Sequence, residues 1–339
     1  MKLGVVILIN VAIGFISTTN WMSFLKDNVS LSDIFIPGSH DSGTYVLSKR
    51  IQPEPLSDFL DRLLDICCRI LKKIGIPIWK VITPWAMTQT QSIFTQAQSS
   101  GIRYFDIRAG WNGTNWNMFH MEEGDPVSFA LYDIKQFLNL YPKEIIIAEI
   151  THYFGIPSNN RAHEQLKAMI MGILGEYLYP CASPSRLCPL PTIGSMRQKN
   201  RRVLVVFTDY FNTSYFAHNP YIWAPIIIVN TYANSDNLEE MIAYNQNETE
   251  YYSKNKNNVL LNKLFKLSWT LTPQPLTIVR GFLPNMPNSI LDITLPAISP
   301  FQTWANKLRE KPSNILIFDY VSRYQIFPYI LKWNNLTIR

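Results

Sequence analysis

Short, mostly apolar segments that alternate with amphipathic ones constrain the fold of this chain more than any other feature. Ile145–Ile150, Arg202–Phe207 and Ile315–Phe318 have the length and composition of strands buried on both faces. Val127–Leu140 and His163–Tyr177 repeat apolar residues at the spacing of a helix. This alternation predicts βαβ units and a parallel sheet in an α/β fold. At 339 residues, an α/β barrel accounts for the chain as one domain.

The same criteria place the other elements. We expect further strands at Ile34–Ile36, Ile102–Ile107, Trp116–His120 and Pro225–Asn230. We expect further helices at Asn20–Asn28, Leu56–Ile74, Gln89–Ser99, Leu238–Ser253 and Asn258–Trp269. No internal repeat and no linker divides the chain.

Composition excludes several classes of protein. The chain is 47% hydrophobic and 17% charged, which is incompatible with intrinsic disorder. The net charge of +6 is spread thinly, with no run of Lys or Arg long enough to indicate nucleic-acid binding. A preference for anionic membrane surfaces or phosphate substrates remains compatible with this charge.

The first residues have the pattern of a secretory signal peptide. One Lys precedes the apolar stretch Leu3–Ile16, and small residues follow at Ser17–Thr19. We therefore predict a signal peptide over residues 1–19 and a catalytic domain over 20–339. A buried N-terminal strand or helix is the alternative. No later segment has the length of a membrane span.

Glycosylation sequons and cysteines agree with a secreted protein. N-x-S/T triplets occur at Asn28, Asn112, Asn212, Asn247 and Asn335. Cys181 and Cys188 bracket a Pro/Ser loop that suits a small disulfide. Cys67 and Cys68 are adjacent and are left unassigned. No Cys/His spacing indicates zinc.

Three polar clusters follow predicted strands, where the active sites of barrels are built. They are Gly38-Ser39-His40-Asp41-Ser42, Arg103-Tyr104-Phe105-Asp106-Ile107-Arg108 and Phe119-His120-Met121. Asp106 and Arg108 are two residues apart on one strand and so face the same side. Two His and one Arg suit phosphodiester chemistry, with a proton acceptor, a proton donor and a cation for the phosphate. The simpler interpretation is a set of ordinary hydrogen-bonding His residues and a structural ion pair, and it applies also to His152, His163 and His218.

The chain resembles the phosphatidylinositol-specific phospholipase C X-domain family, most closely its eukaryotic X-domain-only proteins and more distantly the bacterial enzymes. The matching pieces run from about residue 20 to 325. They include Trp21-Met22, Leu31-Ser32-Asp33, Ile36 through Gly43, Thr88-Gln89, Gln96, Gly101 through Arg108, Phe119-His120, Trp269 through Pro273, and Asn314 through Asp319. The resemblance implies a distorted TIM-like (β/α) barrel with its active site at the C-terminal ends of the strands.

The resemblance also assigns roles. His40 matches the general base that deprotonates the inositol 2-hydroxyl, and Asp319 matches the carboxylate that orients this base. His120 matches the general acid for the diacylglycerol oxygen, and Asp41 its carboxylate partner. Arg108 matches the phosphate-binding residue, and Asp106 a supporting carboxylate of the substrate pocket.

This assignment implies metal-independent cleavage to cyclic inositol phosphate and diacylglycerol. Calcium-dependent relatives place Asn after the first His and an acidic residue at the position of Arg108. Here these positions hold Asp41 and Arg108, and a guanidinium can take over the work of a cation on the phosphate. We expect no metal and no cofactor, a phospholipid substrate at a membrane surface, and a monomer.

Departures from the bacterial pattern leave the headgroup pocket open. No Lys occurs near Ala148–His152, and Asp209 stands where the bacterial enzymes have a basic residue. Trp269 and Tyr210 are candidates to stack on a sugar face, with core aromatics as the alternative. A helical insertion around residues 51–85 is expected either to touch the membrane or to pack on the barrel. Two other functions stay open, a catalytically weak phosphoinositide- or glycosylphosphatidylinositol-binding protein and a phosphodiesterase acting on another phospholipid.

Overall fold

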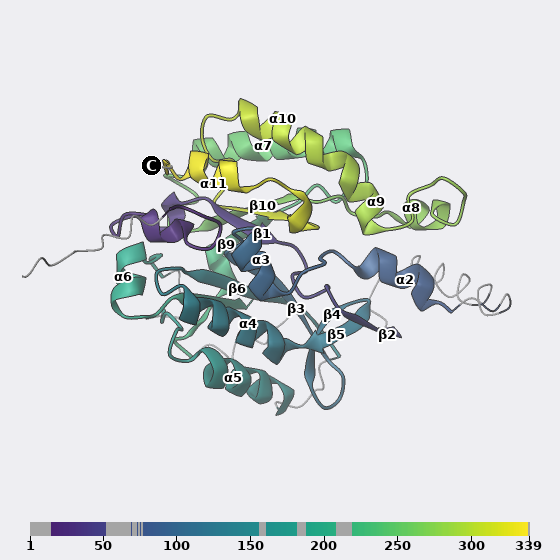
Figure 1. Cartoon of the computed structure of the whole chain (residues 1–339), viewed down its shortest axis with the longest axis horizontal. Helices are drawn as coiled ribbons and strands as arrows, with labels where there is room; N and C mark the ends of the chain where they lie inside the picture. Colours follow the sequence, from purple (N-terminus) through teal and green to yellow (C-terminus); the bar gives the residue numbers. More distant parts are fainter. Residues whose placement is uncertain are drawn as a thin grey trace, which may run out of the picture.

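The computed structural model describes residues 15–51, 69, 73, 75, 77–155, 161–181, 188–207 and 219–337 of the chain (Figure 1). The apolar part of the predicted signal peptide and most of the predicted helix Leu56–Ile74 lie outside these residues. Most of the expected helical insertion around residues 51–85 also lies outside them. Of this insertion, the structure describes α2 (Trp79–Ala86).

Eight parallel strands form an open barrel. Starting from β1, one side of the sheet runs through β3, β6, β7 and β8, and the other through β11, β10 and β9. The strands are β1 (Ile36–Ser39), β3 (Tyr104–Trp111), β6 (Ile146–Phe154), β7 (Val203–Phe207), β8 (Ile222–Trp223), β9 (Ile228–Thr231), β10 (Leu264–Trp269) and β11 (Ile315–Phe318). Within the described residues no pairing joins β8 to β9. The predicted distorted TIM-like barrel is confirmed.

β3 also begins an antiparallel arm outside the barrel. Its second half pairs with β4 (Trp116–His120), which pairs with β5 (Glu122–Pro126), and this pairs with β2 (Leu47–Ile51). Gly113, with a φ of 98°, turns the chain between β3 and β4. The predicted strand at Trp116–His120 is therefore correct, but it runs antiparallel to its neighbour.

Helices flank the barrel on opposite sides. Figure 1 shows α7, α10 and α11 along one side and α4, α5 and α6 along the other. Their bounds are α3 (Ile93–Ser99), α4 (Val127–Leu140), α5 (Arg161–Leu174), α6 (Ile193–Gln198), α7 (Leu238–Asn255), α8 (Pro275–Arg280), α9 (Ile290–Thr294), α10 (Ile298–Lys307) and α11 (Phe327–Trp333). The predicted helix over 127–140 is found with the same bounds, while Asn20–Asn28 forms only the 3-10 turn Trp21–Phe24.

The predicted helix Asn258–Trp269 is wrong, because its second half is strand β10. Asn262 has a φ of 60°, which turns the chain just before the strand. All six residues of β10 are buried, so helices cover one side of the strand and the barrel interior the other. A short apolar run of this kind has no surface alternation that would distinguish a strand from a helix.

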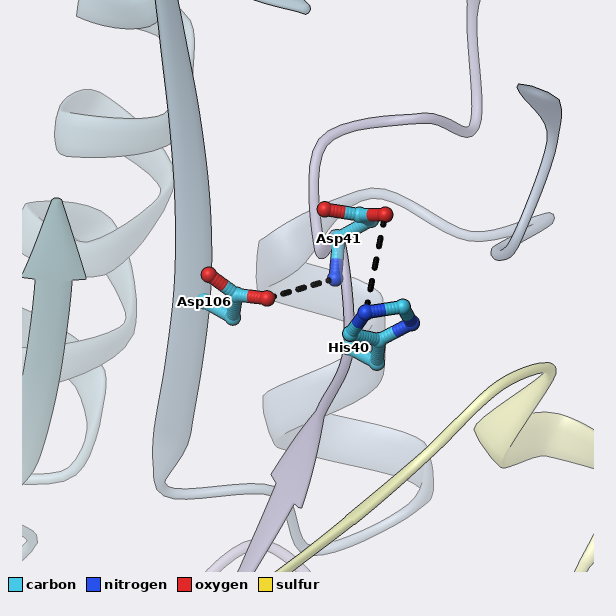
Figure 2. A group of neighbouring side chains, drawn as sticks. All are labelled: His40, Asp41 and Asp106. Carbon is cyan, nitrogen blue, oxygen red and sulfur yellow. Dashed lines mark hydrogen bonds and ion pairs between the residues drawn. The ribbon is translucent and has the colours of Figure 1, made fainter. Parts of the chain in front are cut away.

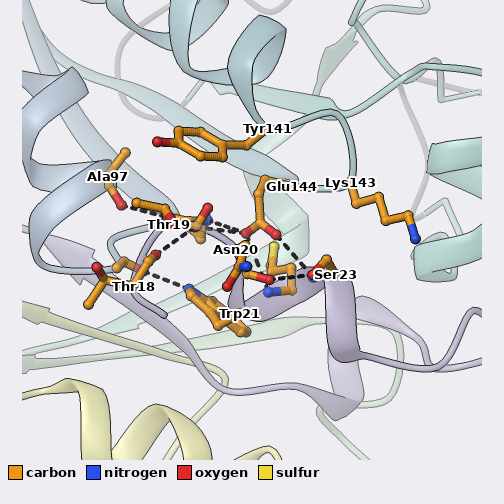
Figure 3. A network of polar contacts seen from close by, with 12 residues as sticks. Thr18, Thr19, Asn20, Trp21, Ser23, Ala97, Tyr141, Lys143 and Glu144 are labelled. Atoms are coloured by element: carbon orange, nitrogen blue, oxygen red, sulfur yellow. Dashed lines mark hydrogen bonds and ion pairs between the residues drawn. The ribbon is translucent and has the colours of Figure 1, made fainter. Parts of the chain in front are cut away.

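A buried ion pair anchors residues 17–23 to the barrel (Figure 3). The fully buried Arg103 guanidinium lies 2.7 Å from the Glu144 carboxylate and donates to the carbonyls of Thr18 and Thr19 at 2.9 and 3.1 Å. Trp21 Nε1 donates to the Gly101 carbonyl at 3.0 Å. Since a buried guanidinium needs acceptors for its donors, Thr18 and Thr19 contribute to the fold where they are present, and removal of the whole predicted signal peptide 1–19 would take these two acceptors away.

Two further sequence predictions concern linkage and membrane spans. Cys181 and Cys188 form a disulfide, as expected. Among the described residues, no helix combines the length and the apolar character that crossing a bilayer requires.

Candidate active site

The end of β1 sets the position of His40. A Cβ atom on Gly38 would lie 2.6 Å from the Tyr104 ring and 2.8 Å from Ile317, so only glycine fits this point in the barrel. The His40 N–H then donates to the Phe318 carbonyl at 3.0 Å and extends the pairing with β11. His40 therefore emerges beside the residue that follows β11.

That residue is Asp319, and it binds the imidazole of His40. His40 Nδ1 lies 2.8 Å from Asp319 Oδ1, and His40 Nε2 lies 3.1 Å from Arg108 Nη2. Because a guanidinium has no acceptor, this second contact requires an unprotonated Nε2. His40 is thus held in the tautomer of a base, with its proton on Nδ1.

The electrostatic environment of His40 favours its protonated form. Burial lowers the pKa of His40, but the Asp41 and Asp319 carboxylates outweigh this effect, against some opposition from Arg108, and raise the pKa to about 9. This field opposes the neutral ring that the Arg108 contact requires. The Arg108 contact therefore belongs to the neutral state of the ring, whereas the two carboxylates stabilise its protonated state.

Asp41 connects the catalytic side chains. Its φ of 41° and nearly complete burial turn the carboxylate into the cluster. One oxygen binds Arg108 Nε, and the other lies 3.4 Å from His120 Nδ1 and 3.7 Å from His40 Nε2. Its backbone N–H donates to Asp106 Oδ2 at 3.2 Å, as Figure 2 shows. One carboxylate thereby contacts the Arg108 guanidinium and lies near both imidazoles.

Asp106 supports this cluster from β3. It accepts a hydrogen bond from Thr151 Oγ1 at 2.8 Å, in addition to the one from the Asp41 backbone. Burial raises the pKa of Asp106, but Arg108 and Lys266 reverse this effect and hold it well below its usual range. Asp106 and Arg108 both line the cavity, in agreement with the expectation that they face the same side of the strand.

His120 comes from the end of β4. Its Nδ1 lies 2.7 Å from the carbonyl oxygen of Ala86, the last residue of α2. A carbonyl only accepts, so Nδ1 carries a proton in this contact, and Nε2 is the nitrogen left to act on a ligand. His120 lines the same cavity as His40.

Gln89 and Thr88 hold the backbone of the catalytic loop. Gln89 Nε2 donates to the carbonyls of His40 and Phe318, each at 2.9 Å. Thr88 Oγ1 lies 3.1 Å from both the His40 and the Asp41 carbonyls. In the sequence, Thr88 and Gln89 stood out only through the resemblance to the phospholipase C family. Their hydrogen bonds to the backbone of this loop were not predicted.

The catalytic side chains open into a cavity of about 670 Å³, within the usual range for small-molecule sites. His40, Asp106, Arg108, His120 and Asp319 all line it, together with Thr88, Glu149, Thr151, His152, Pro225, Ile228, Asn230, Tyr232, Asn234, Lys266, Ser268, Thr270, Leu271, Thr272, Pro273, Ile290 and Ile317. The structure thus gathers around one cavity the five residues assigned to catalysis, with Asp41 buried beneath the other four.

Lys266 and Glu149 form a buried ion pair in this cavity that the sequence analysis missed. Lys266 Nζ lies 2.7 Å from Glu149 Oε2 and 3.0 Å from the Tyr104 hydroxyl. The prediction of a helix over Asn258–Trp269 concealed Lys266. The available signal was a single charge inside the short apolar run Leu264–Trp269.

Trp269, a predicted substrate-binding residue, is not found at the cavity. Trp269 is 1% exposed, and its ring packs on Phe301 and Trp304 of α10 at centroid distances of 5.4 and 4.9 Å. It belongs to the core, and its assignment to a sugar face is corrected accordingly. Tyr210 lies outside the described residues.

Three of these side chains could in principle ligate a metal ion. Ligand atoms of His40, Asp41 and Asp106 lie within 4.8 Å of one another (Figure 2). The Arg108 guanidinium, however, contacts both His40 Nε2 and the Asp41 carboxylate. A fixed organic cation thus already engages two of the three groups, and the donor set does not offer the six or more oxygens that calcium prefers.

Known proteins are similar to this chain in sequence and in fold. No family model matches the chain. The chain is 26% identical over 333 residues to mouse PI-PLC X domain-containing protein 2, a match that covers 95% of this chain and 89% of that protein. It is 30% identical over 198 residues to human PI-PLC X domain-containing protein 1, covering 56% of this chain and 57% of that protein.

Solved structures give the same result for the fold. The phosphatidylinositol-specific phospholipase C from Listeria monocytogenes superposes with a TM-score of 0.62 at 23% identity, covering 95% of this chain and all of that one. The enzyme from S. aureus superposes with a TM-score of 0.59 at 20% identity, covering 90% of this chain and 91% of that one. The chain is therefore a relative of the PI-PLC X domain-containing proteins and has the fold of the bacterial phosphatidylinositol-specific phospholipases C.

Proposed function

We propose that this protein is a metal-independent phospholipase C that cleaves phosphatidylinositol-like lipids to cyclic inositol phosphate and diacylglycerol. The observation that carries this proposal is the arrangement of His40, Arg108 and His120 around one cavity, with Asp319 and Asp41 as their carboxylate partners. It provides a proton acceptor, a phosphate-binding cation and a proton donor.

The reaction begins at His40. Its Nε2 takes the proton of the inositol 2-hydroxyl, while the Nδ1–H donates to Asp319 and stabilises the imidazolium that forms. The 2-oxygen then forms a bond to phosphorus within the same molecule, so nucleophile and phosphate are already close. Arg108 moves from His40 Nε2 to the phosphate and neutralises the charge that develops there.

His120 completes the reaction. Its Nε2 gives a proton to the diacylglycerol oxygen as the bond from phosphorus to that oxygen breaks. The hydrogen bond from Nδ1–H to the Ala86 carbonyl fixes the ring, and one oxygen of the Asp41 carboxylate lies 3.4 Å from the same nitrogen. One proton enters at His40 and one leaves from His120, so the enzyme returns to its starting charge after proton exchange with water.

An apolar rim beside the cavity supports action at a membrane surface. Thr270–Pro273 and Ile290 line the cavity. Residues 274–289 connect these two parts of its lining and do not themselves line it. Figure 1 shows this segment, with α8, projecting from the body. Its exposed side chains include Leu276 (62% exposed) and Leu283 (58% exposed), with Phe282 and Met286. Apolar side chains beside a lipid-binding cavity favour contact with a bilayer surface.

We further propose that the chain enters the secretory pathway as a monomer. The signal-peptide pattern, the Cys181–Cys188 disulfide and the exposed sequons at Asn28, Asn247 and Asn335 support this route. N-terminal sequencing of secreted protein tests whether the signal peptide is removed. A mobility shift on deglycosylation tests whether the sequons carry sugar, and light scattering tests the monomeric state. A retained N-terminus with no attached sugar contradicts the secretory assignment.

Product analysis tests the enzyme proposal. Purified protein is incubated with phosphatidylinositol micelles in EDTA, beside the variants His40→Ala and His120→Ala. His163→Asn, on α5 away from the cavity, is the control for loss of a histidine. We expect cyclic inositol phosphate in EDTA from the wild type and the control, and none from the two variants. Activity that appears only with calcium, or that survives both Ala substitutions, contradicts the mechanism.

A further inference from the structure

A second hollow lies between α3 and the segment that leads from β11 into α11. Its volume is about 350 Å³, toward the lower end of the usual range for small-molecule sites. The described residues that line it are Thr18, Gln91, Ser99, Ser100, Ser322, Tyr324, Gln325, Ile326, Phe327 and Pro328. None of these residues lines the catalytic cavity. A ligand in this outer hollow therefore leaves the catalytic cavity free.

Two side chains of this lining carry buried polar atoms that lack a hydrogen-bond partner among the described residues. These atoms are the hydroxyl oxygen of Tyr324, a residue that is 6% exposed, and Oε1 of Gln91. The Tyr324 ring is held by packing on Phe318 and Phe301, at centroid distances of 4.8 and 5.6 Å. Buried polar groups in folded proteins nearly always have partners. Two such atoms in one lining therefore indicate that a partner is supplied from outside the chain.

The two atoms require a partner that both donates and accepts. Gln91 Oε1 is an amide oxygen, which only accepts. Burial raises the pKa of Tyr324, with a smaller contribution from the Asp319 carboxylate, so its hydroxyl keeps a proton that it can donate. Hydroxyl groups fulfil both requirements. A single water does so too, but it occupies only about 30 Å³, so the hollow has room for a larger molecule with several hydroxyls.

The lining also specifies the charge of this molecule. No Asp, Glu, Lys, Arg or His occurs among the ten described residues that line the outer hollow. A charged ligand would find no countercharge in this lining, and that disfavours its transfer from water. The hydroxyl residues Ser99 and Ser100 and the apolar side chains of Ile326 and Phe327 suit the polar and the C–H faces of a neutral polyol.

We propose that the outer hollow is a second binding site, which takes a small neutral polyol through hydrogen bonds to Gln91 and Tyr324. Ser99, Ser322 and Gln325 are exposed at its edge, so a ligand reaches it directly from solvent. The site is separate from the proposed catalytic centre, and its test does not depend on the proposed activity.

Saturation-transfer NMR on the full chain tests the site, with sorbitol as the probe. Gluconate is the matched probe, because it has the same six-carbon chain with a carboxylate at one end. We expect saturable binding of sorbitol with a Kd on the order of 1 mM, since few contacts hold it. Gluconate should bind at least about tenfold more weakly. Thermal stabilisation is not the readout, because polyols also stabilise folded proteins through exclusion from their surfaces.

Four variants locate the bound sorbitol. Tyr324→Phe removes only a hydroxyl that has no described partner, and Gln91→Met removes the amide oxygen at a similar volume, so neither change breaks a described side-chain hydrogen bond. Ser99→Trp fills the hollow from the exposed end of α3. Ser253→Trp is the matched control, because it adds the same side chain at an exposed position of α7 outside the lining.

The expected results distinguish this site from binding elsewhere. Tyr324→Phe and Gln91→Met should each weaken sorbitol binding at least about fivefold, the loss of one hydrogen bond. Ser99→Trp should abolish it, and Ser253→Trp should match the wild type. If Ser99→Trp does not fold, the two conservative variants still decide the question.

Three outcomes overturn the inference. The first is the absence of saturable sorbitol binding to the wild type. The second is unchanged binding in Tyr324→Phe and Gln91→Met or in folded Ser99→Trp, which places the polyol elsewhere on the protein. The third is equal binding of sorbitol and gluconate, which contradicts a site for neutral ligands.

Discussion

The carboxylate beside His40 provides the sharpest test of the catalytic assignment. Asp319 Oδ1 lies 2.8 Å from His40 Nδ1, and a hydrogen bond to a charged group contributes about 1.5–3 kcal/mol. One pKa unit corresponds to about 1.36 kcal/mol, so Asp319→Asn should lower the pKa of His40 by about one to two units. The wild-type value is about 9.

The sign of the activity change follows from the role of His40. A general base acts only when it is unprotonated, so kcat/KM of the wild type rises with pH up to about 9. In Asp319→Asn this rise occurs at lower pH, while the plateau falls because the ring is no longer held in one tautomer. Initial rates over roughly pH 6 to 10 on phosphatidylinositol micelles measure both effects.

A control separates this effect from a general change in charge. Asp236 is an exposed carboxylate on another loop, and Asp236→Asn should leave the pH profile unchanged. A rise at the same pH in wild type and Asp319→Asn would refute the assignment of His40 and Asp319 as base and orienting carboxylate. Stability follows the opposite course, since the raised pKa of His40 stabilises the fold fully below pH 6.5 and this contribution disappears as pH approaches about 9.

Three further predictions concern stability and cofactors. Arg103→Met leaves the buried Glu144 carboxylate without its partner, and we expect a loss of about 3–5 kcal/mol in urea unfolding; an unchanged midpoint contradicts this. Gly38→Ala forces a Cβ against Tyr104 and Ile317, and should cost about 1–3 kcal/mol while lowering kcat, measured by thermal unfolding and initial rates. EDTA treatment should leave activity unchanged, because a guanidinium already contacts two of the three possible ligands; recovery only after calcium addition refutes this.

The grouping of the residues proposed for catalysis was predictable from sequence, because most of them lie at or just after the end of a strand within a short motif. His40 and Asp41 follow β1, Asp319 follows β11, and Asp106 and Arg108 share one face of β3. The parallel barrel brings these strand ends together, so local order along the chain was sufficient. His120 was harder, since it reaches the site through an antiparallel strand that the alternation of elements did not predict.

The Lys266–Glu149 pair was not predictable because its contacts cross the barrel. Lys266 and Glu149 are 117 residues apart in sequence, and no local pattern indicates such a pair. The misassigned strand also explains the error at Trp269. Lys266 and Ser268 face the cavity, so the alternation of a strand turns Phe265 and Trp269 outward to the helices. Recognition of β10 as a strand would have moved Trp269 to the core and Lys266 to the site.

Backbone geometry shows how the site maintains its form. Non-glycine residues with positive φ stand beside the catalytic groups at Asp41 (41°), Met121 (58°), His152 (48°) and Tyr320 (48°). Each costs of order 1–3 kcal/mol unless surrounding contacts impose it. Tyr320 has such contacts. Its N–H donates to the Thr88 carbonyl at 2.6 Å and its hydroxyl donates to the Met87 carbonyl at 2.7 Å.

One segment, Met87–Gln89, makes hydrogen bonds to both the turn at Asp41 and the turn at Tyr320. The segment Met87–Gln89 accepts hydrogen bonds from Tyr320 and donates to the carbonyls of His40 and Asp41. It therefore ties the loop that carries the base to the loop that carries its orienting carboxylate. Because His40 and Asp319 follow two adjacent parallel strands, β1 and β11, their 2.8 Å contact depends on this tie as well as on the register of the sheet. Loss of the hydrogen bonds to Met87–Gln89 would therefore act on the His40–Asp319 contact as well as on the backbone of the two turns.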